Sequence, residues 1–248
     1  MIKIQAIKSE SVIKLGDDLF SILRRLPKIK TGDIFVISSK VVSLCEGRAI
    51  PKDKVKSRDA LIVSESEQYI PRRPMPRGQA LITVKNHTLT LSAGVDEFGE
   101  NFLLWPKRPA KTAEKIWRFF RRRDKIKKFG VIIADSHSVP LRRGALGFAL
   151  GFHGFKPLRI YRGSRDLFGR VMKMTIANLA DGLAAAAVAE MGEGGEQTPF
   201  ALISGAKAVD FGQSVFGRAK DESRFYPASD EDFFAPFLKS KIWKKKRQ

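Results

Sequence analysis

Acidic and hydroxyl side chains follow two apolar segments of the chain, and such residues are common metal ligands. The run 131–134 (Val-Ile-Ile-Ala) is typical of a buried strand and stops at Asp135 and Ser136, while Asp96 follows Val95 after a second strand-like stretch. Mg²⁺ and Mn²⁺ prefer oxygen ligands and leave coordination positions for substrate phosphates. Each aspartate alone is more often a turn or capping residue. The pair therefore predicts a cation site only where the fold brings the two together.

A third carboxylate lies where helix electrostatics disfavour it. Glu193 stands in a glycine-rich sequence, 192–195, directly after an alanine-rich segment that ends at Met191. A negative charge past a helix C-terminus is opposed by the helix dipole. This placement indicates a compensating cation, although a solvent-exposed loop would tolerate the charge as well.

Several arginines are candidates for binding anionic groups. Arg142, Arg143, Arg162 and Arg170 lie between the predicted strand at 131–134 and the alanine-rich segment. A guanidinium group can hold phosphate or carboxylate through paired hydrogen bonds. The alternative for each is an ordinary surface ion pair.

Other chemistries are disfavoured by composition and spacing. A single cysteine, Cys45, excludes an internal disulfide, and with only three histidines it argues against structural zinc. The sequence contains no phosphate-binding G-x-x-x-x-G-K-[ST] loop, and its glycines do not follow a strand as a dinucleotide fingerprint requires. Ser136 and His137 are adjacent on a strand and face opposite sides, which argues against a Ser–His nucleophile. His137 and His153 are interpreted as structural.

The chain offers no obvious membrane segment. No apolar run reaches the ~18 residues that a membrane helix needs, and the start, residues 1–4, lacks the long apolar stretch of a secretory signal. We expect a soluble, cytoplasmic protein with no membrane span.

The formal net charge is +20, with an isoelectric point near 10.2. Basic residues cluster at 72–73, at 121–128 and in the tail 239–247. Such a balance favours polyanionic partners, including nucleic acid bound through the basic tail. The alternative is a solvated surface with no specific partner.

Hydrophobic periodicity predicts a mixture of helices and strands. We expect strands at 2–7, 34–37, 131–134 and 199–203, a hairpin formed by 80–84 and 88–92, and helices at 15–26, 40–46, 112–128 and 175–191. Thr112 is the expected cap of the third helix and Gly130 follows its end. The glycine-rich segment 144–154 predicts close backbone approach. Residues 71–76, rich in proline, should form a loop.

Strands and helices do not alternate regularly, so the fold class is α+β with mixed or antiparallel sheets rather than a doubly wound sheet. We expect one domain over residues 1–215, built of two intertwined parts, and a C-terminal extension with the basic tail over 216–248.

Taken in order, seven pieces of the sequence resemble the coenzyme F420-0:L-glutamate ligase family. They are 11–14 before 16–18, 32–40, Ser43 with 46–48, 93–96, 132–144, 161–170 and 191–195. The resemblance covers about Ile2 to Ala206, and no single motif carries it.

The resemblance implies a dimeric, GTP-dependent ligase that uses two Mg²⁺ or Mn²⁺ ions. Asp96 and Asp135 would hold one ion, and Ser136 and Glu193 the other. The nucleotide would be lined by Ser11, Val12, Ile13, Lys14, Ser39, Lys40, Gly192, Glu193, Gly194 and Gly195. Arg142, Arg162 and Arg170 would clamp phosphate or substrate.

The implied reaction has two steps. A carboxylate on an anionic, phosphorylated acceptor takes the γ-phosphoryl group as an acyl phosphate, and the amine of L-glutamate then displaces phosphate. No protein nucleophile is needed, in agreement with finding none.

The chain departs from the family pattern at two positions, and its segment between Arg48 and Glu65 is shorter than in typical members. Leu44 stands where a lysine is common, and Gly99 where an asparagine is common, with Asn101 nearby. Two alternatives therefore stay open: a ligase of the same fold with another acceptor or amino acid, and a non-catalytic polyanion- or nucleic-acid-binding protein.

Overall fold

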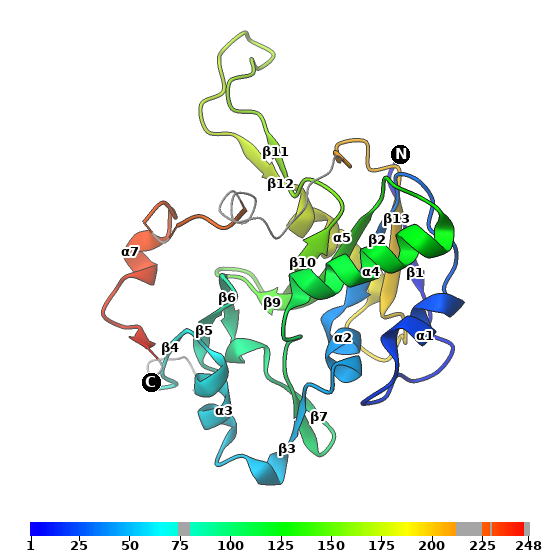
Figure 1. The fold of residues 1–248 in the computed structure, drawn as a ribbon. Coiled ribbons are helices and arrows are strands. Elements are labelled where there is room, and N and C mark those ends of the chain that lie inside the picture. Colours follow the sequence, from blue (N-terminus) through cyan, green and yellow to red (C-terminus); the bar gives the residue numbers. More distant parts are fainter. Residues whose placement is uncertain (74–79, 212–224, 229, 246–248) are drawn as a thin grey trace.

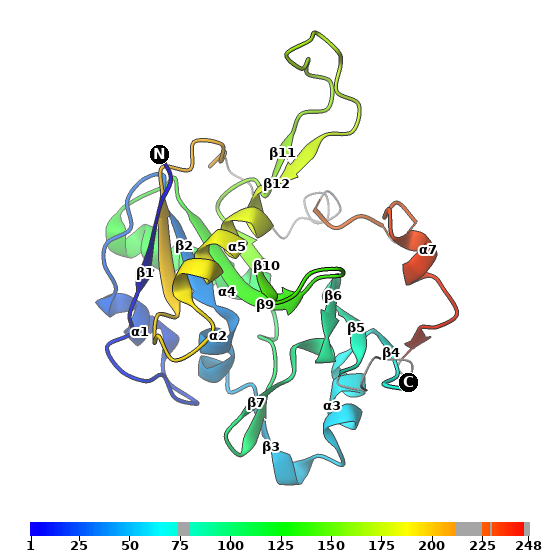
Figure 2. The same cartoon turned by 180° about the vertical axis from the view of Figure 1, so that it is seen from behind.

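The computed structural model describes residues 1–73, 80–211, 225–228 and 230–245 (Figures 1 and 2). Along these residues the strands are β1 (Lys3–Ile7), β2 (Ile34–Ser38), β3 (Ala49–Pro51), β4 (Gln68–Ile70), β5 (Ile82–Lys85), β6 (Thr88–Leu91), β7 (Asp96–Phe98), β8 (Asn101–Leu103), β9 (Gly130–Ser138), β10 (Ala145–His153), β11 (Leu158–Ile160), β12 (Ile176–Asn178), β13 (Phe200–Ser204) and β14 (Lys244–Lys245). The helices are α1 (Leu19–Arg25), α2 (Ser39–Cys45), α3 (Arg58–Glu65), α4 (Pro109–Asp124), α5 (Leu179–Met191) and α7 (Ala235–Leu238).

The main sheet has five strands in the order β1-β13-β2-β9-β10. β2 and β9 run parallel, and the other neighbours are antiparallel. Three smaller antiparallel sheets accompany it: β14-β4-β5-β6, β3-β8-β7 and β11-β12. The predicted α+β class with mixed sheets is confirmed.

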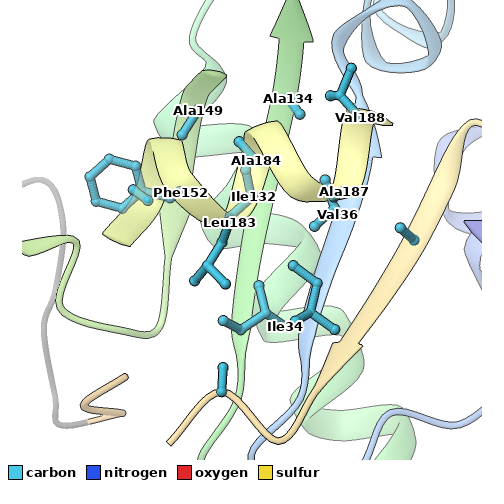
Figure 3. Packing of buried hydrophobic residues seen from close by; sticks show 14 of the residues in the cluster. Ile34, Val36, Ile132, Ala134, Ala149, Phe152, Leu183, Ala184, Ala187 and Val188 are labelled. Carbon is cyan, nitrogen blue, oxygen red and sulfur yellow. The ribbon is translucent and has the colours of Figure 1, made fainter. Parts of the chain in front are cut away.

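Helices cover both faces of the main sheet. α4 crosses one face together with α1 and α2, and α5 crosses the other (Figures 1 and 2). The continuous apolar runs in β2 and β9 alternate between the two layers. Val36 and Ile132 point to the α5 side, where they pack with Ala184 (Figure 3), whereas Phe35 packs with Phe120 on the α4 side. Burial on both faces explains why these strands are apolar throughout.

Two glycines of β10 let the two helices approach this strand. A Cβ at Gly147 would lie 2.6 Å from Val188 of α5, and one at Gly151 would lie 2.6 Å from Pro109 of α4. A shift in register between Ala149 and Gly151 turns these glycines to opposite faces. The predicted close backbone approach in the glycine-rich segment is confirmed.

The helix expected at 112–128 is present, but both of its ends differ from the prediction. α4 begins at Pro109 after Arg108, and Thr112 is not its cap. The Thr112 hydroxyl donates a 2.7 Å hydrogen bond to Glu46 instead, so it joins α4 to the end of α2. The helix ends at Lys125, whose left-handed backbone (φ 55°) stops it before Gly130. Proline at the first turn, where no amide hydrogen is needed, explains the earlier start.

The alanine-rich helix is shorter than expected. Residues 176–178 form β12 and pair with β11, and Asn178 caps α5 by accepting from the Asp181 amide at 3.0 Å. β9 is longer than expected. It continues to Ser138, because β10 pairs with it past Asp135. What ends near Asp135 is the burial of the strand.

The hairpin around Asn86 and His87 is confirmed, and both residues have positive φ, as a tight two-residue turn requires. The proline-rich loop at 71–76 falls largely outside the described residues, as does the expected domain boundary near 215. No described helix combines the length and apolar character needed to traverse a bilayer.

Candidate active site

A cavity of about 340 Å³ opens at one end of the main sheet. Its walls come from the start of α2, the partly exposed part of β9, the end of α5, the segment after β1, and Phe98 of β7. Eight residues proposed from the sequence line it: Val12, Ile13, Lys40, Asp135, Ser136, Gly192, Glu193 and Gly194. The structure therefore joins four distant parts of the predicted site.

β9 forms one wall of this cavity. Burial falls from Ala134 to Asp135 and Ser136, so that polar side chains follow the apolar run where the strand reaches the cavity. The Ser136 hydroxyl donates to Glu193 Oε2 at 3.1 Å, which connects β9 to the loop after α5. Ser136 and Glu193, 57 positions apart in the chain, thus lie together as one oxygen-rich pair.

Lys40 lies among three carboxylates. It occupies the first turn of α2, which Ser38 caps, and its Nζ is 3.1 Å from Asp96 Oδ2. Burial alone would lower the pKa of Lys40, but the charges of Asp96, Asp135 and Glu193 raise it overall. The acidic residues of the predicted site therefore surround one cationic side chain.

Asp135 is the most strongly perturbed of these acids. Its burial, and after that the negative charge of Asp96, raise the pKa of the carboxyl to about 6. The Ser136 amide, 2.9 Å from Oδ1, the Ser39 hydroxyl and the charge of Lys40 act in the opposite direction. Perturbed carboxyl groups of this kind gather where a protein binds cations or performs proton chemistry.

Asp96 is held by a strained turn. Ser92, Ala93 and Gly94, directly before Val95, all have positive φ values, 55°, 51° and 65°. Such a conformation costs free energy at the two residues that carry a side chain. At Gly94 a Cβ would overlap the Trp105 indole, so only glycine fits.

Hydrogen bonds from neighbouring elements maintain this turn. The Ala93 amide donates to Thr83 Oγ1 at 2.8 Å, and the Ala93 carbonyl accepts from Lys85 Nζ at 3.2 Å. Arg58 donates to the Val95 carbonyl at 3.2 Å. The position of Asp96 next to Lys40 therefore depends on side chains of α3 and β5.

A buried ion-pair network supports Lys85. Its ammonium is 2.7 Å from Glu65 Oε2, and the same oxygen is 3.2 Å from Arg48 Nη2. Burial by itself would raise the pKa of Glu65, but Lys85 and Arg48 lower it overall. Sequence reasoning missed these three residues. The available signal was Lys85 in the same strand alternation as the buried Thr83.

The other proposed nucleotide-binding residues lie around the cavity or outside it. Ser39 is buried and directed at Asp135. Ser11 lines an adjoining cavity of about 260 Å³, which shares Ile13 with the first. Lys14 and Gly195 are exposed and line neither of the two.

The proposed arginine clamps are not brought to this cavity within one chain. Arg162 and Arg170 lie on the segment between β11 and β12, which projects away from the body in both views (Figures 1 and 2). Arg170 pairs with Asp166 at 3.2 Å, and Arg142 donates to the neighbouring Leu141 carbonyl. Their role as clamps stays a prediction.

The donor set has the chemistry of a hard-cation site. Among the described residues no group of three or more Asp, Glu, His or Cys side chains is arranged to hold a metal ion. Asp96, Asp135, Ser136 and Glu193 nevertheless offer oxygen atoms alone, around a position where Lys40 already places positive charge. Mg²⁺ and Mn²⁺ fit such a set when substrate phosphates supply further oxygens.

The two departures from the family pattern have different surroundings. Leu44 is buried and gives the cavity an apolar wall. Gly99 lies in the turn between β7 and β8 with φ 54°, and nothing surrounds the place of a side chain.

Comparison with known proteins agrees with the resemblance. A family model described as F420-0:Gamma-glutamyl ligase matches residues 8–205. The coenzyme F420:L-glutamate ligase of Archaeoglobus fulgidus is 32% identical over 92% of this chain and 94% of its own length. The proteins of the same name from Methanocaldococcus jannaschii and Methanopyrus kandleri are 33% and 31% identical, over 94% and 83% of this chain and 97% and 88% of their own lengths.

Proposed function

The chain belongs to the F420-0:gamma-glutamyl ligase family, and on this basis we propose that it joins L-glutamate to coenzyme F420-0, with GTP as the phosphoryl donor and Mg²⁺ or Mn²⁺ as the cation. The observation that carries the proposal is that Lys40, Asp135 and Glu193 line one cavity of about 340 Å³, where Lys40 also pairs with Asp96 at 3.1 Å. A triphosphate needs cations, and the cations need oxygen ligands.

The proposed reaction proceeds in two balanced steps. An oxygen of the acceptor carboxylate attacks the γ-phosphorus of GTP, which forms an acyl phosphate and releases GDP. The amine of L-glutamate then attacks the acyl carbon, phosphate leaves, and the proton lost by nitrogen departs with it. The bond formed is an amide, and no covalent protein intermediate occurs.

The cation would be held by Asp96, Asp135, Ser136 and Glu193. When bound, it would neutralise phosphate charge and the charge that develops on the transferred group.

Lys40 would bind phosphate oxygens. Its ammonium stays protonated because three carboxylates surround it. Once cations satisfy those carboxylates, the side chain is available to a neighbouring phosphate. At the same wall the amide groups of Gly192 and Gly194 are already engaged, by the Val188 carbonyl at 3.0 Å and by Glu196 Oε2 at 2.8 Å, so phosphate binding would rest on Lys40 and the cations.

The direct test uses purified protein with GTP, Mn²⁺, L-glutamate and F420-0. The expected products are GDP, phosphate and an acceptor heavier by one glutamate residue, with no reaction when the metal is chelated. Lys40→Met should abolish product formation, and Lys239→Met, an exposed lysine in the C-terminal segment, is its matched control. Absence of both product and GTP binding heat would contradict the proposal.

A second candidate keeps the chemistry and changes a substrate. Leu44 makes one wall of the cavity apolar, and this wall can alter which acceptor or amino acid fits. A mass-spectrometric screen of acceptors with each amino acid separates the two: GTP turnover with another pair, and none with F420-0 and glutamate, would favour this candidate. We also propose a homodimer, which size-exclusion chromatography with light scattering tests.

A further inference from the structure

One surface of the molecule is made of basic side chains alone. Every exposed residue from position 107 to position 128 is a lysine or an arginine. We call these ten residues the basic face: Lys107, Arg108, Lys111, Lys115, Arg118, Arg121, Arg122, Lys125, Lys127 and Lys128. With Arg123, and against Glu114 and Asp124, this segment contributes 11 − 2 = +9 of the chain's net +20.

Folding of α4 does not need this composition. The helix is anchored by its buried side, through Ala113, Ile116 and Phe120. No acidic residue occupies its first turn, where the helix dipole would favour one. Like charges four residues apart, such as Lys111 and Lys115, repel one another. This repulsion opposes the gain that Arg121 and Arg122 obtain at the helix C-terminus, so helix stability alone does not explain ten exposed cations.

Arg123 differs from the residues of the basic face, because its guanidinium group is bonded within the protein. It is half-buried, donates to the carbonyl oxygens of Leu23, Leu26 and Pro27, and pairs with the buried Asp124. Among the described residues, the ten of the basic face contain one ion pair, that of Arg118 with Glu114. Arg121 in addition stacks over Trp117.

The bonds of Arg123 also extend the positive surface. They hold the end of α1 against the end of α4, and there Arg24, Lys28 and Lys30 are exposed. The segment after α1 is joined to this end by the Ile29 amide, which donates to Asp124 at 3.1 Å. The positive charge thus continues from one helix to the next.

We propose that the basic face binds the phosphate backbone of a nucleic acid without reading its sequence. Sixteen helical residues present cations over roughly 24 Å, a length that spans several successive phosphates. All exposed residues of the segment are charged, so it lacks the apolar side chains that a membrane-surface helix inserts. Its two partly exposed aromatic rings are engaged within the protein, Trp117 with Phe129 and Phe119 with Phe20, which leaves the backbone as the ligand.

This surface is separate from the ligase cavity. The cavity is lined from α2, β9, α5 and neighbouring segments, and no residue of α4 is among its lining residues. Binding at the basic face should therefore leave glutamate ligation unchanged, and the inference does not depend on the proposed reaction.

The test measures binding of the full chain to a fluorescein-labelled duplex DNA and a single-stranded RNA by anisotropy, between about 50 and about 200 mM salt. The variant combines Lys111→Gln, Lys115→Gln, Arg122→Gln and Lys127→Gln. Its matched control combines Lys239→Gln, Lys241→Gln, Lys244→Gln and Lys245→Gln, which removes the same charge from exposed positions of the C-terminal segment.

We expect the α4 variant to lose at least about tenfold in affinity and to lower the salt slope by roughly three to four, while the control changes the slope by less than about one. Equal losses in both variants, or a larger loss in the control, would overturn the proposal in favour of bulk charge or of the tail. Preference for anionic vesicles over nucleic acid would overturn it as well. If the α4 variant does not fold, Lys111→Ala with Lys115→Ala provides the same comparison in a good helix former.

Discussion

The cavity and the basic face gather opposite charges by opposite means. At the cavity, Asp135 of β9 and Glu193 after α5 line the same space as Lys40, Asp96 of β7 pairs with this lysine, and each is placed by tertiary contacts. The ten cations of the basic face come from one continuous segment, five from α4 and five from the residues directly before and after this helix. The three carboxylates, far apart in the sequence, therefore meet only because the fold brings them together. Function built this way is sensitive to distant packing, whereas a charged helix surface is not.

The largest effect should come from the cavity. Asp135→Ala removes an oxygen ligand and leaves Lys40 less well compensated, so we expect ligation to fall by about 10²–10³-fold or more. Asp53→Asn, an exposed acid remote from the cavity lining, is the control and should retain activity. Steady-state rates of GDP release measure both. Wild-type rates in Asp135→Ala would remove this residue from the site.

The next largest effect should come from the turn that precedes Asp96. Gly94→Ala forces a methyl group into the Trp105 indole, and we expect the free energy of unfolding to fall by about 3 kcal/mol. Gly163→Ala also meets a positive φ, 87°, but in open space, and should cost ~1 kcal/mol. Urea denaturation of the two variants separates steric from conformational cost. Equal losses would show that the turn is not packed as described.

The buried ion pair beneath the turn should matter more than an exposed one. Lys85→Met leaves Glu65 with Arg48 alone and removes a donor from the Ala93 carbonyl, so we expect a loss of about 2–3 kcal/mol. The pKa of Glu65 is lowered in the folded protein, so the contribution exists above its ordinary value of 4.5 and disappears as pH falls through the folded pKa. Lys52→Met, which breaks the exposed pair with Glu97, should cost less than about 1 kcal/mol. Denaturation curves at neutral and acidic pH test both statements.

The raised pKa of Asp135 predicts an opposite pH dependence. Between the ordinary value, 3.8, and about 6, the folded protein holds a proton that the unfolded chain has released. The stability of the metal-free protein should therefore decrease as pH rises through this window. Asp135→Asn removes the cost, and we expect it to be more stable than wild type by ~1–2 kcal/mol near pH 7, but not below the window. A constant difference at all pH values would contradict the assignment.

The smallest stability effect should come from the basic face. The fourfold glutamine variant of α4 removes repulsion between like charges, worth a few tenths of a kcal/mol per pair. Thermal unfolding should show no loss or a slight gain relative to wild type. A large loss would mean that these residues are structural, and the contrast between the two regions would disappear.

The two regions differ in how much of their structure could be predicted from the sequence. The spacing of apolar residues in β2, β9 and α4 and the glycines of β10 are local sequence patterns. Those elements could therefore be predicted. Ser136 and Glu193 were proposed as neighbours only through the family resemblance, because contacts between residues 57 positions apart carry no local pattern. The same holds for Thr112, whose bond to Glu46 could not be seen from its cap-like position. Lys40 was assigned to the nucleotide, and its place among the carboxylates emerged only from the structure.

For the basic face, the sequence showed the positive charge but not which side chains are exposed. The cluster at 121–128 was evident from composition, but the uniform basic face required burial to be known residue by residue. Arg123, in the middle of that cluster, proved to be structural. Local composition thus predicted a charged surface and did not show which of its members are available to a partner.

We propose that the carboxylates around Lys40 form a cation site. Mn²⁺ binding in the presence of GDP, measured by electron paramagnetic resonance on wild type, Asp135→Asn, Glu193→Gln and the control Asp53→Asn, tests it most directly. We predict binding to wild type and the control, and at least about tenfold weaker binding to both cavity variants. Unchanged Mn²⁺ affinity in Asp135→Asn and Glu193→Gln would contradict the account.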